Sequence, residues 1–385
     1  KIEYAKYFCI GLIIMLKSFL KDTHFTALNE KSSYYKEVKK LDNLFNLIKG
    51  KKEFDFLRCN ISFKIFFSIE KVIHSEKKAI YEYKKLLNDC FKESKNYIDL
   101  INFRLKEDKA FSSRLENKKN KFNGLVSKIT GEHYSELFKN FSKYHLIDQP
   151  NTLLKKRFVR NKFPLSFFKN KTGLDIGCGN GRYTFALKSF GLKNILGIDV
   201  SQRNIDTCNY NKKKFKIKNV FFKKGDATNL KFNNESFDFS MSYGVFHHTG
   251  KMNQSIEEMI RVTKKGGKGL IFLIGMGGIR WNAIEICRRI LQYTDREYIY
   301  NHFDGTIFSG KYYYLFLDHV LVKINENKSR NQIKKIFDKK KIKDYKIWDY
   351  GSDREDIHRL KISKLNNKNK FDIYGEGEVK VIFTK

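Results

Sequence analysis

Proline and paired cysteine are scarce in this sequence. Its 385 residues contain two prolines, Pro150 and Pro164, and six cysteines. No two cysteines have the C-x-x-C spacing of a zinc site, and their scatter suggests no disulfide framework. This cysteine usage indicates a reducing compartment, so we expect a cytoplasmic protein without a structural metal.

A run of apolar residues long enough to cross a bilayer is also missing. The apolar run 8–16 stops at Lys17, far short of the ~20 residues that a spanning helix needs. We therefore expect no transmembrane segment and interpret this run as a buried helix. The chain begins with Lys1 rather than Met, which leaves open a missing upstream segment.

Positive charge is in large excess, with 77 Lys and Arg against 42 Asp and Glu and a formal net charge of +35. Such a charge attracts phosphates, acidic glycans or an anionic membrane surface through its long-range field. The lysines are spread along the chain rather than gathered in one tail, so solvated surface lysines are the simpler interpretation.

Residues 1–125 have the pattern of a basic helical region. Gly is rare there, and apolar residues recur at helical intervals, as at Leu41, Leu44 and Ile48. Charged and aromatic residues alternate from Lys77 to Leu105, which suits an amphipathic helical pair. A sustained heptad pattern is absent, so a coiled coil is not expected.

Residues 126–385 are predicted to form one α/β domain with a Rossmann-like, seven-stranded parallel sheet whose last strand returns antiparallel. Its cofactor-binding core spans 171–275, a helical cover insertion follows the fifth strand over 276–340, and the last strands lie within 341–385. Helices are expected after the first, second and fourth strands. The expected strands are 172–176, 194–199, 220–223, 237–242, 269–274, 345–350 and 378–384.

A glycine-dense turn follows the first strand, in Asp175-Ile176-Gly177-Cys178-Gly179-Asn180-Gly181-Arg182. Glycine allows positive φ and removes the Cβ, so a ligand can approach the backbone, and the next helix offers free N–H groups to an anion. A dinucleotide-binding turn needs a third glycine where Arg182 stands. The turn is therefore a poor NAD site.

Three aspartates lie in or directly after the first three expected strands, in an order that suits the parts of a nucleoside cofactor. Asp199 ends the second strand, where it can accept hydrogen bonds from ribose hydroxyls, and Asp226 follows the third, where it can accept an adenine amine. Asp175 either binds the amino group of a cofactor or caps the glycine turn, and the sequence favours neither.

The motifs together resemble the class I S-adenosylmethionine-dependent methyltransferases. Gly244-Val245-Phe246-His247-His248-Thr249 resembles the G-V-L-H-H-T segment of one branch, and residues 261–267 resemble its R-V-L-K-P-G-G turn. The resemblance implies S-adenosylmethionine as cofactor, with its methionine part on the glycine turn, its ribose on Asp199 and its adenine near Asp226. The cofactor contacts that we expect are Asp175, Gly177, Gly179, Gly181, Asp199, Asp226, Ala227 and Tyr243.

Methyl transfer from a sulfonium needs no obligatory catalytic residue, because the donor is already activated and the enzyme aligns the acceptor. A base is needed only for an acceptor of high pKa, such as a sugar hydroxyl. His247, His248 and Asp318 are the candidates for that base. The histidine pair has a second interpretation, in which it supports the loop and lines the pocket.

The insertion lies where a substrate cover belongs, which favours a small-molecule, glycan or lipid-precursor acceptor methylated on oxygen. Its aromatic residues either wall the acceptor or pack the cover; they include Phe303, Phe308, Tyr312 and Tyr314.

The alternative is an RNA methyltransferase that binds the phosphates of RNA with the basic N-terminal region. It is less favoured, because residues 242–245 lack the N-P-P-Y tetrad of amino-directed nucleic-acid enzymes. A third hypothesis is a non-catalytic binding module. The sequence does not fix the oligomeric state.

Overall fold

The computed structural model describes residues 25–107, 142–303, 311–350 and 365–385. The chain divides into two compact units, the first from residues 1–124, 277–323 and 365–375 and the second from residues 125–276, 324–364 and 376–385. Residues 277–323 thus join the N-terminal helices in one unit. The apolar run 8–16 and the predicted boundary near residue 125 lie outside the described residues.

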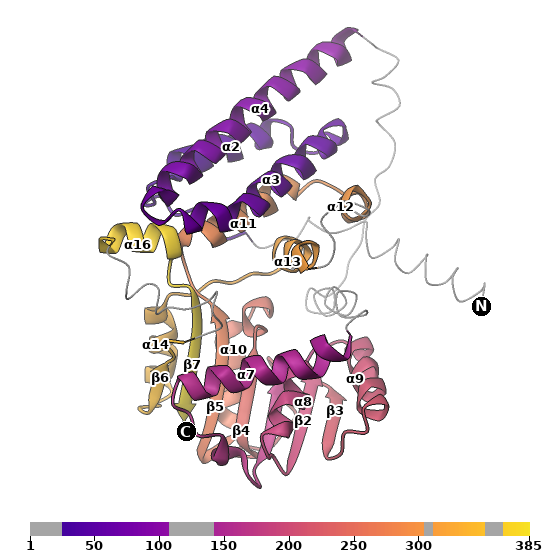
Figure 1. Cartoon of the computed structure of the whole chain (residues 1–385), viewed down its shortest axis with the longest axis vertical. Coiled ribbons are helices and arrows are strands. Elements are labelled where there is room, and N and C mark those ends of the chain that lie inside the picture. Colours follow the sequence, from indigo (N-terminus) through magenta and orange to yellow (C-terminus); the bar gives the residue numbers. More distant parts are fainter. Residues whose placement is uncertain (1–24, 108–141, 304–310, 351–364) are drawn as a thin grey trace, which may run out of the picture. The chain divides into compact units, whose positions relative to one another are not determined.

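The first unit is helical, as predicted for the N-terminal region (Figure 1). The interpretation of residues 77–105 as a helical pair was wrong, because one 29-residue helix, α4 (Ala79–Glu107), covers all but the first two of them. No glycine or proline interrupts it. Helix α11 is buried along most of its length and contacts α3. The described α-helices of this first unit are α2 (Tyr35–Leu47), α3 (Asp55–His74), α4 (Ala79–Glu107), α11 (Gly278–Leu291), α12 (Arg296–Phe303), α13 (Lys311–Val320) and α16 (Asn367–Tyr374).

The second unit contains the predicted seven-stranded sheet, with strand order β3-β2-β1-β4-β5-β7-β6. Strands β1 to β5 are parallel, and β7 pairs antiparallel with both β5 and β6. The chain crosses from the β3 edge back to β4 beside β1, and ligands of parallel sheets bind at such a reversal of strand order. The strands are β1 (Thr172–Ile176), β2 (Asn194–Asp199), β3 (Val220–Lys224), β4 (Phe237–Tyr243), β5 (Thr263–Ile274), β6 (Tyr345–Ile347) and β7 (Glu378–Thr384).

Helices cover both faces of this sheet (Figure 1). One face carries α7 (Gln149–Arg160), α8 (Arg182–Ser189) and α9 (Gln202–Lys214), with Phe158 and Phe239 in its apolar core. The other face carries α10 (Met252–Val262) and α14 (Arg330–Lys339). Buried residues alternate along the strands between these two cores, as expected for a sheet packed on both sides.

The cap of α9 is Ser201, whose hydroxyl accepts the Asn204 N–H. No side chain caps α10, which starts at Met252 after Lys251. Ser255 lies inside this helix, where its hydroxyl donates to the Lys251 carbonyl.

Within the ranges that the structure describes, no helix is long and apolar enough to cross a membrane. No group of three or more His, Cys, Asp or Glu side chains there is arranged to hold a metal ion. The cysteines in those ranges are all free and buried; they are Cys59, Cys90, Cys178, Cys208 and Cys287.

Candidate functional site

The glycine turn follows β1 directly, with its backbone in a conformation that glycine favours. Gly177, Gly179 and Gly181 have φ angles of +77°, +54° and +85°. A Cβ on Gly177 would lie 2.4 Å from the Val245 side chain, so no larger residue fits. Gly181 is the N-cap of α8, so the free N–H groups of the first helical turn begin at this point. The turn therefore suits an anionic ligand group.

Asp199 ends β2 beside this turn. Its Oδ2 accepts the Gly179 N–H at 2.9 Å, and its Oδ1 accepts the Ser201 N–H at 2.9 Å and the Asn204 side-chain amide at 3.0 Å. A carboxylate has about four acceptor positions, so one, on Oδ2, stays open for a ribose hydroxyl. Binding both hydroxyls, as expected from the sequence, would require one internal bond to give way.

Burial also affects the charge of Asp199. Its side chain is almost fully buried, which raises its pKa, while the three hydrogen bonds act in the opposite direction. The bonds therefore hold the carboxylate in place and favour its charged form.

Asp175 lies inside β1 and ties this strand to α8. Its Oδ2 accepts the Thr184 hydroxyl at 2.6 Å. Burial raises the pKa of Asp175 to about 7; the Thr184 bond lowers this pKa and the nearby charge of Asp199 raises it. This contact links β1 to α8. Both predicted roles of Asp175, capping the glycine turn and binding the cofactor's amino group, stay predictions.

Asp226 lies in the exposed turn after β3. Its Oδ1 accepts both the backbone N–H and the hydroxyl of Thr228, each at 2.8 Å. Both bonds use the same oxygen, so Oδ2 is available for the adenine amine that the sequence suggested. Ala227 is half-buried next to it and packs against the core under α10 and α14.

Tyr243 ends β4 and belongs to an aromatic cluster. The centre of its ring lies 4.7 Å from that of Tyr183 and 4.6 Å from that of Phe272, on which it stacks. The guanidinium carbon of Arg157 lies 5.0 Å from the Tyr243 ring centre, and an Arg157 nitrogen donates to the Tyr183 hydroxyl at 3.3 Å. The cluster joins α7, α8, β4 and β5 near the glycine turn.

Sequence reasoning found only Tyr243 among these residues. Tyr183 stands two residues after the last glycine of the turn, which was a usable signal. Arg157 and Phe272 come from α7 and β5, and nothing in their local sequence marks them.

His247 and His248 follow β4 in a short helical turn, with ring centres 4.0 Å apart. His248 Nδ1 lies 2.6 Å from the Ile324 carbonyl oxygen, and the His247 carbonyl accepts the Glu326 N–H at 2.8 Å. A carbonyl only accepts, so Nδ1 of His248 is the donor in this contact, and a base on this ring would be Nε2. Both histidines are buried and support the loop.

Asp318 lies on α13 in the helical unit, where its carboxylate is 3.7 Å from Nδ1 of His319. Its role as a base stays a prediction. Phe308 lies outside the described residues, as do the side chains of Phe303, Tyr312 and Tyr314, of which only the helical backbone is described. Their role in walling the acceptor stays a prediction.

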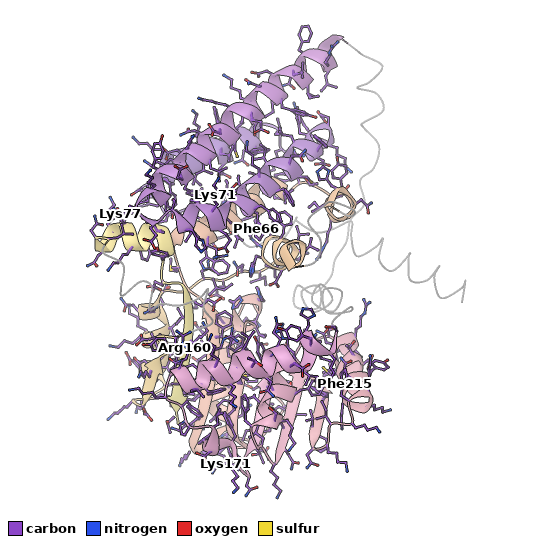
Figure 2. All side chains as sticks on the ribbon, viewed as in Figure 1. Phe66, Lys71, Lys77, Arg160, Lys171 and Phe215 are labelled. Atoms are coloured by element: carbon purple, nitrogen blue, oxygen red, sulfur yellow. The ribbon has the colours of Figure 1, made fainter. Side chains whose placement is uncertain are left out.

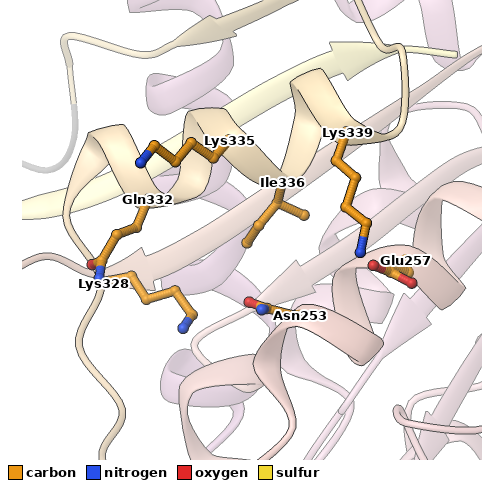
Figure 3. A pocket seen from close by; sticks show the side chains of 7 residues that line it. All are labelled: Asn253, Glu257, Lys328, Gln332, Lys335, Ile336 and Lys339. Carbon is orange, nitrogen blue, oxygen red and sulfur yellow. The ribbon is translucent and has the colours of Figure 1, made fainter.

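A pocket of about 290 Å³ lies between α10 and α14 (Figure 3). In Figure 3, Lys339 points toward Glu257, and the ion pair of Glu257 is with Lys340, at 2.9 Å. None of the predicted cofactor contacts lines this pocket, so it is separate from the glycine turn. Its lining residues are Asn253, Glu257, Lys328, Gln332, Lys335, Ile336 and Lys339.

The residues of the turn fit the expected cofactor. Asn180 is buried, and its Nδ2 has no hydrogen-bond partner among the described residues. A buried unpaired donor is costly unless a ligand satisfies it. Asn180 Nδ2, the amides that start α8 and the open acceptor of Asp199 thus suit a ligand with a carboxylate and a ribose, as S-adenosylmethionine has.

Comparison with known families supports this assignment. Residues 174–271 match a family model described as a methyltransferase domain. The match runs from β1 into β5 and includes the glycine turn, Asp199, Asp226 and the histidine pair.

Curated relatives share the same region. The chain is 31% identical over 157 residues to a demethylmenaquinone methyltransferase of Lactobacillus johnsonii, covering 37% of this chain and 62% of that one. It is 30% identical over 98 residues to a phthiotriol/phenolphthiotriol dimycocerosates methyltransferase of Mycobacterium tuberculosis, covering 25% and 35%. It is 32% identical over 114 residues to the tRNA (carboxymethyluridine(34)-5-O)-methyltransferase alkbh8 of Xenopus tropicalis, covering 29% and 17%. The chain thus spans less than two thirds of each relative.

Among solved structures, a SAM-dependent methyltransferase from Aquifex aeolicus aligns over 65% of this chain and 97% of its own, with 15% identity and a TM-score of 0.37.

Proposed function

We propose that this chain transfers a methyl group from S-adenosylmethionine to an oxygen of a lipid-precursor, glycan or other small-molecule acceptor. The match of residues 174–271 to a methyltransferase domain supports the proposal. The observation that carries the proposal is the hydrogen bond between Asp199 and the glycine turn. It holds a carboxylate that can accept a ribose hydroxyl beside a backbone that a ligand can approach.

The cofactor supplies an activated methyl group, so the residues of this chain mainly bind, orient and exclude water. The glycine turn and the start of α8 hold the methionine part. Asp199 accepts a ribose hydroxyl, and Asp226 accepts the adenine amine. Tyr243, held between Tyr183 and Phe272, forms a rigid wall next to the reacting groups.

An oxygen acceptor of high pKa has to lose its proton during transfer. We assign this step to Nε2 of His248, because the Ile324 carbonyl fixes the proton on Nδ1. His247 and Asp318 are the alternative bases. A lipid or phenolic acceptor of lower pKa would need none of them.

Two curated relatives support the lipid-precursor part of the proposal, since their names refer to menaquinone and mycocerosate lipids. The relative named for tRNA supports RNA as the second candidate. We continue to expect the cytoplasm, on the argument from cysteine usage.

Two experiments test the proposal. Calorimetry with S-adenosylmethionine and with an Asp199→Ala variant tests cofactor binding, and absent binding by the wild type would refute an enzyme of this class. Incubation of methyl-labelled cofactor with fractionated cell extract then identifies the acceptor. Label in the lipid, glycan or small-metabolite fraction supports the proposal, and label confined to RNA favours the second candidate.

A further inference from the structure

The edge of the sheet at β3 carries a stretch of strong positive charge. Between Asp206 and Asp226 the chain contains seven lysines and no acidic residue. The stretch covers the second half of α9, the following turn and β3, which is an edge strand. In Figure 2, Phe215 marks this edge, from which side chains extend outward. The lysines are Lys212, Lys213, Lys214, Lys216, Lys218, Lys223 and Lys224.

No carboxylate of the described residues neutralises these ammonium groups. None of the seven forms an ion pair with a carboxylate in the part of the chain that the structure describes, and six of them are exposed. Elsewhere in the same unit, Lys264 pairs with Asp238 and Lys340 pairs with Glu257. The positive charge of this edge is therefore uncompensated among the described residues.

Two large aromatic side chains stand among these lysines. Tyr210 is 63% exposed and Phe221 is 51% exposed. The Lys212 ammonium lies 5.1 Å from the Phe221 ring centre, and the Lys214 ammonium lies 5.8 Å from that of Tyr210. Cation–π contacts of this kind keep the charges and the rings on one surface.

Protection of an edge strand explains only half of this pattern. Lysines at an open edge prevent pairing with another chain, but an exposed Phe at the same edge works against that purpose. Lysine combined with exposed aromatic residues is instead typical of a surface that meets the interface of a membrane, where the ring enters the headgroup layer and the amines meet anionic lipid.

We propose that this α9–β3 face, residues 210–224, binds the surface of an anionic lipid bilayer. The register of β2 and β3 places Lys224 directly beside Asp199, so the face extends to the edge of the sheet at which the cofactor site lies. A bilayer bound here brings lipid-soluble acceptors to that edge. The binding itself does not depend on methyl transfer.

RNA fits the same face less well. The stretch contains no arginine, the residue whose planar, bidentate guanidinium best matches individual phosphates. One face of each exposed ring is also approached by a lysine of the chain itself, which leaves less ring surface for stacked bases. A diffuse anionic surface needs neither feature.

Vesicle sedimentation tests the proposal with the full chain. We expect binding to vesicles of phosphatidylcholine mixed with phosphatidylglycerol, weak binding to phosphatidylcholine alone, and release by salt. Each lysine near such a surface contributes roughly fivefold to binding. The triple change Lys212→Gln, Lys213→Gln and Lys214→Gln should therefore lower the partition coefficient on the order of 100-fold, and Phe221→Ser should lower it further.

The matched control removes the same charge elsewhere, through Lys334→Gln, Lys335→Gln and Lys339→Gln on α14, and should leave most of the binding. An equal loss in the control would mean that only the overall net charge matters, which overturns the proposal. Equal binding to neutral vesicles, or binding of polyuridylate but not vesicles through this face, would also overturn it. Calorimetry with S-adenosylmethionine checks that each variant is folded. If the proposed enzyme function is wrong, the wild type also shows no cofactor binding, and the vesicle result stands independently of that failure.

Discussion

The carboxylate of Asp199 accepts the backbone N–H of Gly179 at 2.9 Å. This bond joins the end of β2 to the glycine turn after β1, two segments about 20 residues apart in sequence. A residue predicted to bind the ribose therefore also fixes the turn predicted to bind the methionine part.

Replacement of Asp199 by Asn should weaken the affinity for S-adenosylmethionine about 10- to 100-fold, because a hydrogen bond to a charged group contributes about 1.5–3 kcal/mol. Titration calorimetry measures this change. The matched control is Asp206→Asn on α9, whose carboxylate accepts a hydrogen bond from Gln202 on the same helix. Unchanged affinity in Asp199→Asn would contradict the assigned role.

Replacement of Gly177 by Ala should lower both stability and cofactor affinity. The positive φ of Gly177 costs about 1–2 kcal/mol for an L-residue, and the new Cβ would also meet Val245 at 2.4 Å. Gly266→Ala isolates the first cost, because its φ is +72° and no described atom lies within 4 Å of the added Cβ. Thermal unfolding should show Gly177→Ala as the more destabilised variant, with partial rescue by Val245→Ala. Equal destabilisation of the two glycine variants would argue against the steric contact.

The Asp175 carboxyl should make stability depend on pH. Its pKa of about 7 in the folded protein exceeds the value near 3.9 of an unfolded chain, so the folded protein keeps a proton that the unfolded chain has released. This contribution to stability is full below about pH 4 and is lost as pH rises through 7. Asp175→Asn cannot ionise and still accepts the Thr184 hydroxyl.

We therefore expect Asp175→Asn to be more stable than the wild type at alkaline pH, by about 4 kcal/mol, with little difference at acidic pH. Urea unfolding across this range measures the effect. Burial also raises the pKa of Glu285 to about 7, so part of the wild-type slope should persist in the variant. A slope as steep as that of the wild type would show that Asp175 is not the titrating group.

Replacement of His248 by Asn should separate catalysis from support of the loop. The Asn amide can still donate to the Ile324 carbonyl but lacks the Nε2 base. If the acceptor needs a base, kcat should fall about 100-fold or more, while cofactor affinity and melting temperature stay close to those of the wild type. His247→Asn is the comparison. A fall in kcat that only parallels a fall in melting temperature would assign His248 to support of the loop.

Much of the sheet could be predicted from sequence because its strands are short apolar runs that end at Gly, Asp or Ser. The pattern located β1, β2 and β7 at their observed bounds and the first residue of β3 and β4. It failed for α4, where alternating charge and aromatic residues suggested a break that the backbone does not contain. The pattern of charged and aromatic side chains indicates which positions are buried, but it does not mark the end of a helix. A helix ends where the backbone leaves its helical conformation.

The sequence by itself determined the glycine turn, the order of the acidic residues after the strands and the resemblance to a methyltransferase, because each depends on residues close together in the chain. Only the tertiary structure decided how Arg157, Tyr183 and Phe272 surround Tyr243, and that Asp199 has one acceptor position left for a ligand. These features depend on contacts between segments that are distant in the sequence. The packing of the helices against the sheet brings these segments together, and no local sequence pattern encodes that packing.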